Sequence, residues 1–244
     1  MFSNRSRVLL VSEGEIAQMS AQSYSEIKAA DKIITNNSQF AMVKRVGERV
    51  AQAANNTLLE AKNTDLLNTF KWEFVLIDSP NVVNAFCMPG GKIAVYTGIL
   101  PLTKTDDDLA VVMSHEVSHA LAQHGNERMS QQLLVGIGSS VLNKVIENNS
   151  PEVKDAYNTI YGVGTTFGVM LPYSRLHETE ADKIGLILMA KAGYNPQAAT
   201  GFWERMSKLG QSKPPEFLST HPSDETRIKD IKAYIPEAMK YYSK

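Results

Sequence analysis

Two histidines and a glutamate stand at the spacing that a single bound metal ion requires. The stretch His115-Glu116-Val117-Ser118-His119 places the histidines four residues apart. On a helix they lie about 6 Å apart along the axis, and both imidazoles point the same way. Two neutral imidazoles on one face can bind one Zn²⁺. Glu116 is rotated by roughly 100° from His115, so its carboxylate can take a proton from water that the ion acidifies.

The residues around this motif predict a buried helix. Apolar side chains recur with the period of one helical face at Leu109, Val112, Met113, Val117, Ala120 and Leu121. Thr105 or Asp106 can cap the start, and the aspartates at 106–108 suit the positive end of the helix dipole. Gly125 is a candidate stop. The flanking apolar residues indicate that the histidines face inwards, whereas the alternative is three polar residues on an exposed helix face.

A catalytic zinc site needs a third protein ligand and a position open to water. Suitable donor atoms occur on His124, His177, Glu178, Glu180, Asp182 and His221. His124 lies five residues after His119, which turns it off the zinc face by about 140°, so we interpret it as structural. Glu178 and Asp182 share a face of a later helix, while Glu180 points elsewhere. We expect Glu178 on the metal and Asp182 behind it, accepting a hydrogen bond from a ligand histidine. The alternative is an acidic first helical turn, favoured by the helix dipole.

In the segment before the motif, the spacing of apolar residues changes from a helical period to alternation. Alternating residues predict strands at 72–78 and 92–96, with a second extended piece at 82–88 and a turn at Pro89-Gly90-Gly91. We expect a small antiparallel sheet just before the zinc helix. Its role is either to cover the core or to present an edge that pairs with an extended peptide.

Helical patterns occupy most of the remaining chain. We expect helices at 13–34, at about 40–54, 127–147 and 152–169, and at 196–210. A further helix continues from the segment 173–182 to Gly193, and a last helix is capped by Ser223 and has Ile235 on its inner face. The glycine-rich pair at 127–169 favours close helix packing over a mobile lid or a surface that touches lipid. Residues 1–60 are predicted to form a helical scaffold, and the motifs lie within 70–235. With no domain boundary in the pattern, we predict one α+β domain over 1–244, mostly helical, with its small sheet bordering the active-site cleft.

Composition excludes several classes of protein. A chain of 244 residues with 43% apolar residues permits a sizeable core. The formal net charge of −1 gives no general affinity for nucleic acid. Cys87 is the single cysteine, so no internal disulfide forms, and we interpret it as a buried thiol. No apolar run is long enough to cross a membrane, and residues 1–10 do not form a signal peptide. The sequence leaves open whether a leader or lipid anchor was removed, and whether the protein associates with a membrane through such an anchor.

The motifs taken together resemble one family. H-E-V-S-H at 115–119, E-T-E-A-D at 178–182, S-T-H-P-S at 219–223 and N-A-F-C-M-P-G-G-K-I-A-V-Y-T-G-I-L at 84–100 are similar to the gluzincin metallopeptidases that group HtpX, the OMA-type proteases and the CAAX prenyl proteases. The soluble bacterial branch is the most similar, over about residues 70–235. The resemblance implies a zincin-like fold and one Zn²⁺ per chain. It also implies roles for individual residues: zinc ligands His115, His119 and Glu178, catalytic base Glu116, Asp182 behind the ligands, and a substrate-binding edge strand at Asn84, Ala85 and Phe86.

Two features are left open by the sequence. His221 precedes Pro222 at the mouth of a helix, where it can stabilise an oxyanion, act as a fourth ligand that closes the site, or pack under the last helix. Arg175 and Arg227 are candidate clamps for Asp182 or for substrate, and nothing local chooses between them.

We therefore expect a zinc metalloendopeptidase that acts on extended or misfolded polypeptides. The resemblance implies protein quality control in the bacterial periplasm or cell envelope. Two other classes stay in play: a latent or chaperone-like protein whose zinc site is capped by His221, and a structural metal domain of a larger assembly. The physiological substrate and the oligomeric state do not follow from the sequence.

Overall fold

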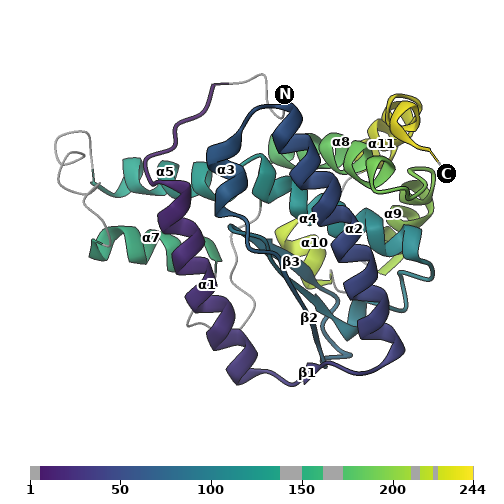
Figure 1. Ribbon diagram of the computed structural model, residues 1–244, viewed down its shortest axis with the longest axis horizontal. Coiled ribbons are helices and arrows are strands. Elements are labelled where there is room, and N and C mark those ends of the chain that lie inside the picture. The colour runs from purple at the N-terminus through teal and green to yellow at the C-terminus, as the bar shows by residue number, and fades with distance from the viewer. Residues whose placement is uncertain (1–5, 138–149, 162–172, 210–214, 222–224, 244) are drawn as a thin grey trace.

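The computed structural model describes residues 6–137, 150–161, 173–209, 215–221 and 225–243. The first half of the described chain contains the following elements: α1 (Glu13–Ala30), β1 (Ile33–Ile34), α2 (Ser38–Glu60), α3 (Thr64–Thr69), β2 (Glu73–Ile77), β3 (Ala85–Met88), β4 (Lys92–Tyr96) and the 3₁₀ turn η1 (Thr97–Ile99). The second half contains α4 (Asp106–Leu121), α5 (His124–Ile137), α7 (Pro151–Tyr161), α8 (Arg175–Lys191), α9 (Ala198–Leu209), α10 (Glu216–Thr220), α11 (Glu225–Ala238) and η2 (Met239–Tyr241). The fold is mostly helical with one small sheet (Figure 1).

The prediction of an antiparallel sheet is wrong, because the sheet is mixed. Its strand order is β1-β2-β4-β3, with β2 and β4 parallel and the other two pairs antiparallel. The turn at residues 89–91 joins β3 to β4 as a hairpin, as expected. The longer link at 78–84 leaves room for one strand between β2 and β3. Strand β4 then occupies this position. Periodicity predicts that strands exist, but it does not fix which strands are neighbours.

Both faces of the sheet are buried. Side chains alternate between them, so Leu76 and Val95 pack with α2, α4, α8 and α9, whereas Ile77 and Tyr96 pack with residues of α1, α5 and α7. Figure 1 shows α1 and α7 along one side of the sheet and α2 and α4 along the other. The sheet thus separates two apolar clusters, and the larger cluster surrounds α4.

The N-terminal helix is shorter than predicted. Ser12 caps α1, and Glu15 reciprocates in a capping box, but the helix ends at Ala30 rather than at residue 34. Ile33 and Ile34 instead pair with β2 as a two-residue strand. The helical spacing of Ile34 predicts that the helix continues to residue 34, but pairing of these β-branched residues with the sheet overrides that local pattern.

Helix α4 is buried on all sides, not on one face alone. Every residue from Asp108 to Ala122 is buried, and Thr105 caps the start by accepting from the amide of Asp108. The predicted stop at Gly125 is wrong. The helix ends at Leu121, Gln123 adopts a left-handed conformation with φ of 58°, and α5 begins at His124. Gly125 allows α5 to pack closely against Tyr161 of α7, because a Cβ at this position would lie 1.8 Å from the Tyr161 hydroxyl.

The predicted helices at 127–147 and 152–169 are only partly within the described residues. Helices α5 and α7 cover 124–137 and 151–161 and pack against each other. The remaining parts of both predictions, 138–147 and 162–169, lie outside the described residues. Among the described residues, no helix combines the length and apolar character needed to span a membrane.

Helices α4 and α8 approach so closely that a glycine is needed between them. A Cβ at Gly185 of α8 would lie 3.2 Å from both Cα and N of His115. We predict that Gly185→Val costs about 1–3 kcal/mol of unfolding free energy by overpacking, or roughly 2–12 °C in melting temperature for a chain of this size. Gly14→Ala is the matched control, because nothing lies within 4 Å of a Cβ at this position in α1. It should stabilise by about 0.4–1 kcal/mol. Equal melting temperatures for the two variants would contradict the close packing.

Candidate metal centre

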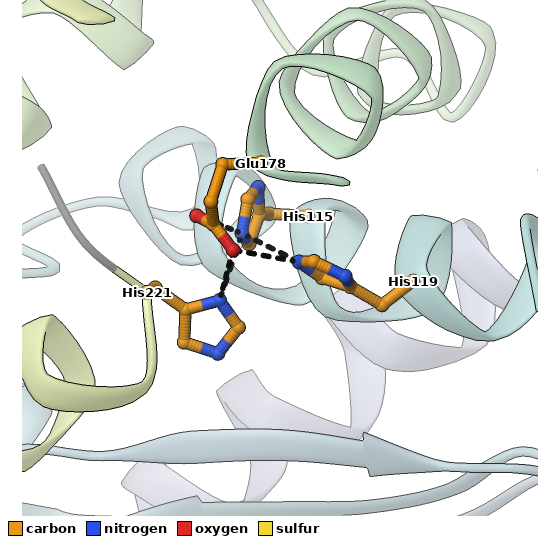
Figure 2. A group of neighbouring side chains, drawn as sticks. All are labelled: His115, His119, Glu178 and His221. Carbon is orange, nitrogen blue, oxygen red and sulfur yellow. Dashed lines mark hydrogen bonds and ion pairs between the residues drawn. The ribbon is translucent and has the colours of Figure 1, made fainter. Parts of the chain in front are cut away.

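Four buried side chains from three elements converge on one point. His115 and His119 come from consecutive turns of α4, Glu178 from the first turn of α8, and His221 from the residue that ends α10. Each is 2–3% exposed. Figure 2 shows the three imidazole rings and the carboxylate pointing toward one another. Their donor atoms all lie within 4.8 Å of one another, so this group can hold a metal ion.

Four of the six separations between the donor atoms are close to those around a tetrahedral ion. Nε2 of His115 lies 3.1 Å from Nε2 of His119 and 3.3 Å from Nδ1 of His221. Oε1 of Glu178 lies 3.0 Å from Nδ1 of His221 and 3.4 Å from Nε2 of His119. Four ligands at zinc bond lengths of 2.0–2.1 Å stand about 3.3 Å apart at the corners of a tetrahedron. Imidazole nitrogen and carboxylate oxygen are also donors that zinc accepts, so these residues fit the ion.

Asp182 and Arg227 lie directly behind the group. Oδ1 of Asp182 lies 2.9 Å from Nδ1 of His115, on the side of the ring away from the other donors. Arg227 of α11 donates two hydrogen bonds of 2.8 Å to Asp182 and contacts Oε2 of Glu178 at 2.8 Å. Its guanidinium lies 3.6 Å from the centre of the Trp203 ring, a cation–π contact. Of the two arginines left open by the sequence, the structure places Arg227 on Asp182.

Charge pairing offsets the cost of burial in this cluster. Burial alone would raise the pKa of Glu178, but His221, Arg227 and His115 hold it well below its usual range. Asp182 has a lowered pKa for the same reason, with Arg227 the largest opposing influence. Burial lowers the pKa of His115, but Glu178 and Asp182 raise it to about 9. For His119 burial prevails, and its pKa falls well below the usual value. Glu178 and His119 are thus in the protonation states that metal ligands require, whereas His115 must give up a proton when a cation binds.

Glu116 is also buried, but its carboxylate does not join the group of four donors. Its Oε1 makes no hydrogen bond within the described part of the chain, and its nearest ionisable neighbour is Nε2 of His221 at 3.4 Å. Burial raises the pKa of Glu116, partly opposed by His221 and His115. A buried carboxylate whose oxygen lacks a donor can accept a proton from a small polar molecule placed beside it.

The remaining candidates for the third ligand lie away from the four donors. His177 faces Glu127 of α5 at 3.3 Å, and His124 faces Glu180 at 2.9 Å. Glu180 points away from the metal group, as its helical position predicts. Glu178 and Glu180 near the start of α8 contact different histidines, so these carboxylates do more than complement the helix dipole.

The predicted edge residues lie at the start of β3. This strand is at one edge of the sheet and packs on α4. Asn84 is anchored by its main-chain oxygen, which accepts from Tyr96, and its side chain accepts from the amide of Ala85. Phe86 turns its ring to the opposite face, into the cluster formed with α1. The amide of Phe217 donates to the oxygen of Val83, which ties the His221 segment to this edge.

Aromatic rings that the sequence analysis missed hold the imidazoles in place. Tyr173 stacks on His119 with ring centres 4.0 Å apart, and Phe217 stacks on His221 at 4.6 Å. Trp203 meets His115 edge-on at 5.9 Å. Phe217 precedes His221 by four residues, a helical spacing that could have indicated it. Tyr173 and Trp203 come from other elements and give no local signal.

Comparison with known proteins agrees with this arrangement. The model of Peptidase family M48 matches residues 37–235. The chain is 34% identical over 246 residues to mitochondrial metalloendopeptidase OMA1 of Schizosaccharomyces pombe, covering 97% of this chain and 66% of that protein. For the protein of the same name in Arabidopsis thaliana, the identity is 35% over 219 residues, covering 90% of this chain and 41% of that protein.

A bacterial relative is more distant. The β-barrel assembly-enhancing protease of Escherichia coli is 27% identical over 230 residues, covering 91% of this chain and 44% of that protein. Across these three relatives, the chain spans between 41% and 66% of their own lengths.

The pairing of Arg227 can be tested by removing it. We predict that Arg227→Ala lowers the unfolding free energy of the metal-free protein by about 3–5 kcal/mol, because two buried carboxylates lose their compensating charge. Arg45→Ala is the matched control, since Arg45 contacts Asp106 with the same 2.8 Å geometry but at the surface. It should change stability little. Urea unfolding measures both, and a similar small effect for the two variants would contradict the proposed pairing.

Proposed function

Because the chain belongs to peptidase family M48, we propose that it is a zinc-dependent metalloendopeptidase. The observation that carries the proposal is the tetrahedral spacing of donor atoms from His115, His119 and Glu178, with Glu116 buried beside them. In this assignment the first three residues are the zinc ligands and Glu116 is the catalytic base. Asp182 holds His115 by accepting from its Nδ1–H, which leaves Nε2 free to bind the metal.

Zinc supplies Lewis acidity, which polarises the scissile carbonyl and makes water easier to deprotonate. Glu116 accepts a proton from the attacking water at Oε1 and later delivers it to the leaving amine. Its buried position suits this work, because burial raises the pKa of the carboxyl and the group can hold the proton between the two transfers. No side chain needs to form a covalent bond with the substrate.

The edge of the sheet supports an extended polypeptide as the substrate. Strand β3 begins at Ala85 and packs on α4, the helix that carries His115 and Glu116. A chain added along Asn84, Ala85 and Phe86 would bind through main-chain hydrogen bonds, which favours broad specificity for unfolded segments. The name of the bacterial relative, which links that protein to β-barrel assembly, is compatible with protein quality control in the cell envelope or periplasm. We propose that setting for this chain.

The base can be tested without disturbing the metal. We predict that the zinc-loaded chain cleaves an unfolded protein such as dye-labelled casein, and that Glu116→Gln cleaves it at least 100-fold more slowly, the usual contribution of a general base. Zinc content should be equal in both proteins, because Glu116 is not a ligand. Substantial residual cleavage by the zinc-loaded variant would contradict the role given to Glu116.

A second candidate function is a latent form of the same enzyme. Nδ1 of His221 lies 3.3 Å from Nε2 of His115 and 3.0 Å from Oε1 of Glu178, the separations of a fourth ligand. With four protein donors the site resembles a closed structural centre, which has no position for water. His221 would then have to leave before hydrolysis, and until then the protein would hold peptide without cutting it.

His221→Ala separates these roles. If His221 closes the site, we predict that the variant cleaves casein faster than the wild type and binds zinc more weakly. If it stabilises the oxyanion, cleavage should fall by about 100- to 1,000-fold with zinc affinity unchanged. Casein cleavage and chelator competition measure the two properties independently. Unchanged activity together with unchanged zinc affinity would exclude both functional roles and leave a packing role for His221.

A further inference from the structure

The ring of His119 has a second polar contact, on the side away from the metal group. Its Nδ1 lies 2.9 Å from Nδ1 of His124, which is fully buried. On a continuous helix, a residue five positions later would point about 140° away. The chain turns instead at Gln123, whose φ is 58°, and α5 starts at His124 in a new direction. This turn brings His124 back against His119.

The positions of the protons follow from the contacts. If Nε2 of His119 gives its lone pair to a metal, the ring must carry its proton on Nδ1. That N–H then donates to Nδ1 of His124, which must accept. His124 consequently carries its own proton on Nε2, and that atom lies 2.9 Å from Oε2 of Glu180. The chain of contacts from Glu180 through His124 to His119 thus permits one arrangement of protons when the metal is bound.

We propose that His124 and Glu180 are positioning residues that fix the tautomer and the orientation of the zinc ligand His119. This inference rests on the proposed zinc site. It replaces the interpretation of His124 as merely structural and gives a partner to Glu180. Asp182 has the corresponding place behind His115, at 2.9 Å from its Nδ1. The two ligand histidines therefore differ, since one meets a carboxylate directly and the other meets one through an imidazole.

Packing holds the relay in its geometry. The ring of His177 stacks on His124 with centres 4.4 Å apart, and Nε2 of His177 lies 3.3 Å from Glu127. Tyr173 covers the face of His119 at 4.0 Å. A rotation of either ring of the His119–His124 pair would have to displace a stacked neighbour as well as break a buried hydrogen bond. Such restraint is what an outer residue contributes to a metal ligand.

Helix α8 supplies the carboxylates for both arms. Glu178 faces the metal, Asp182 lies behind His115, and Glu180 lies behind His124. Glu178 and Asp182 are four residues apart and share one face of the helix, whereas Glu180 between them points in another direction. One helix can therefore reach the metal group and both histidine arms, because residues of α4 and the first residue of α5 contact its first turns.

The test is zinc affinity, measured by competition with a chromogenic chelator and independent of peptidase activity. We expect His124→Ala and Glu180→Ala to raise the zinc dissociation constant by about 10- to 100-fold. His124→Asn should recover part of the loss, because its side-chain oxygen can accept from Nδ1–H of His119. The double variant should bind zinc no more weakly than His124→Ala, since Glu180 acts through His124. The control is Glu48→Ala, which removes an exposed carboxylate on α2.

The melting temperature of the metal-free proteins separates positioning from packing. If His124 only fills space, His124→Ala will lower the metal-free melting temperature and leave the zinc dissociation constant unchanged, which would overturn the inference. Additive losses in the double variant would also overturn it. A wild-type chain that binds no zinc would contradict the proposed function itself, and the inference with it, whereas equal zinc binding by wild type and His124→Ala contradicts the inference alone.

Discussion

The structure depends on a set of charges buried between α4 and α8. Glu178 and Asp182 of α8, Glu116 of α4 and the guanidinium of Arg227 are all nearly inaccessible to water. Bringing such groups out of water is costly unless each has a partner. Arg227 contacts Glu178 and Asp182, and the imidazole of His221 contacts both Glu178 and Glu116. The close approach of the two helices at Gly185 is what allows these pairs to form.

The same constraint gives the site its chemistry. Packing that excludes water from around Glu116 raises its pKa, and packing that surrounds His119 lowers the pKa of its imidazole. A neutral imidazole is a metal ligand, and a carboxylate with a raised pKa is a stronger proton acceptor. The aromatic residues Tyr173 and Phe217 contribute by fixing the rings whose lone pairs must converge. Stability and function are thus set by one set of contacts.

Much of this site follows from local spacing, and the rest does not. The four-residue interval between His115 and His119 predicts that they share a face, because the α-helix fixes that geometry whatever surrounds it. The same rule places His124 off the metal face but does not predict its contact with His119, because a left-handed residue at Gln123 redirects the chain. Short-range patterns do not report such a turn when the residue is not glycine.

Local sequence patterns do not predict contacts between elements that are far apart in the chain. The strands were predicted from alternation, but β4 lies between β2 and β3 because of the route of the intervening link. Likewise, the choice of Arg227 rather than Arg175 as the partner of Asp182 depends on how α11 packs on α8. The position of His221 depends on α10, whose amide at Phe217 is held by the edge of the sheet. Each of these is a tertiary relation between segments that are far apart in the sequence.

The most direct test of the proposed zinc site is to locate the bound metal by crystallography. Crystals grown with zinc and measured at the zinc absorption edge should show one anomalous peak per chain. We predict that this peak lies about 2.0–2.2 Å from Nε2 of His115, Nε2 of His119 and a carboxylate oxygen of Glu178. Its distance from Nδ1 of His221 then distinguishes a closed site from an open one. Zinc bound only to surface side chains, with no peak between these three residues, would show that they do not form the metal site.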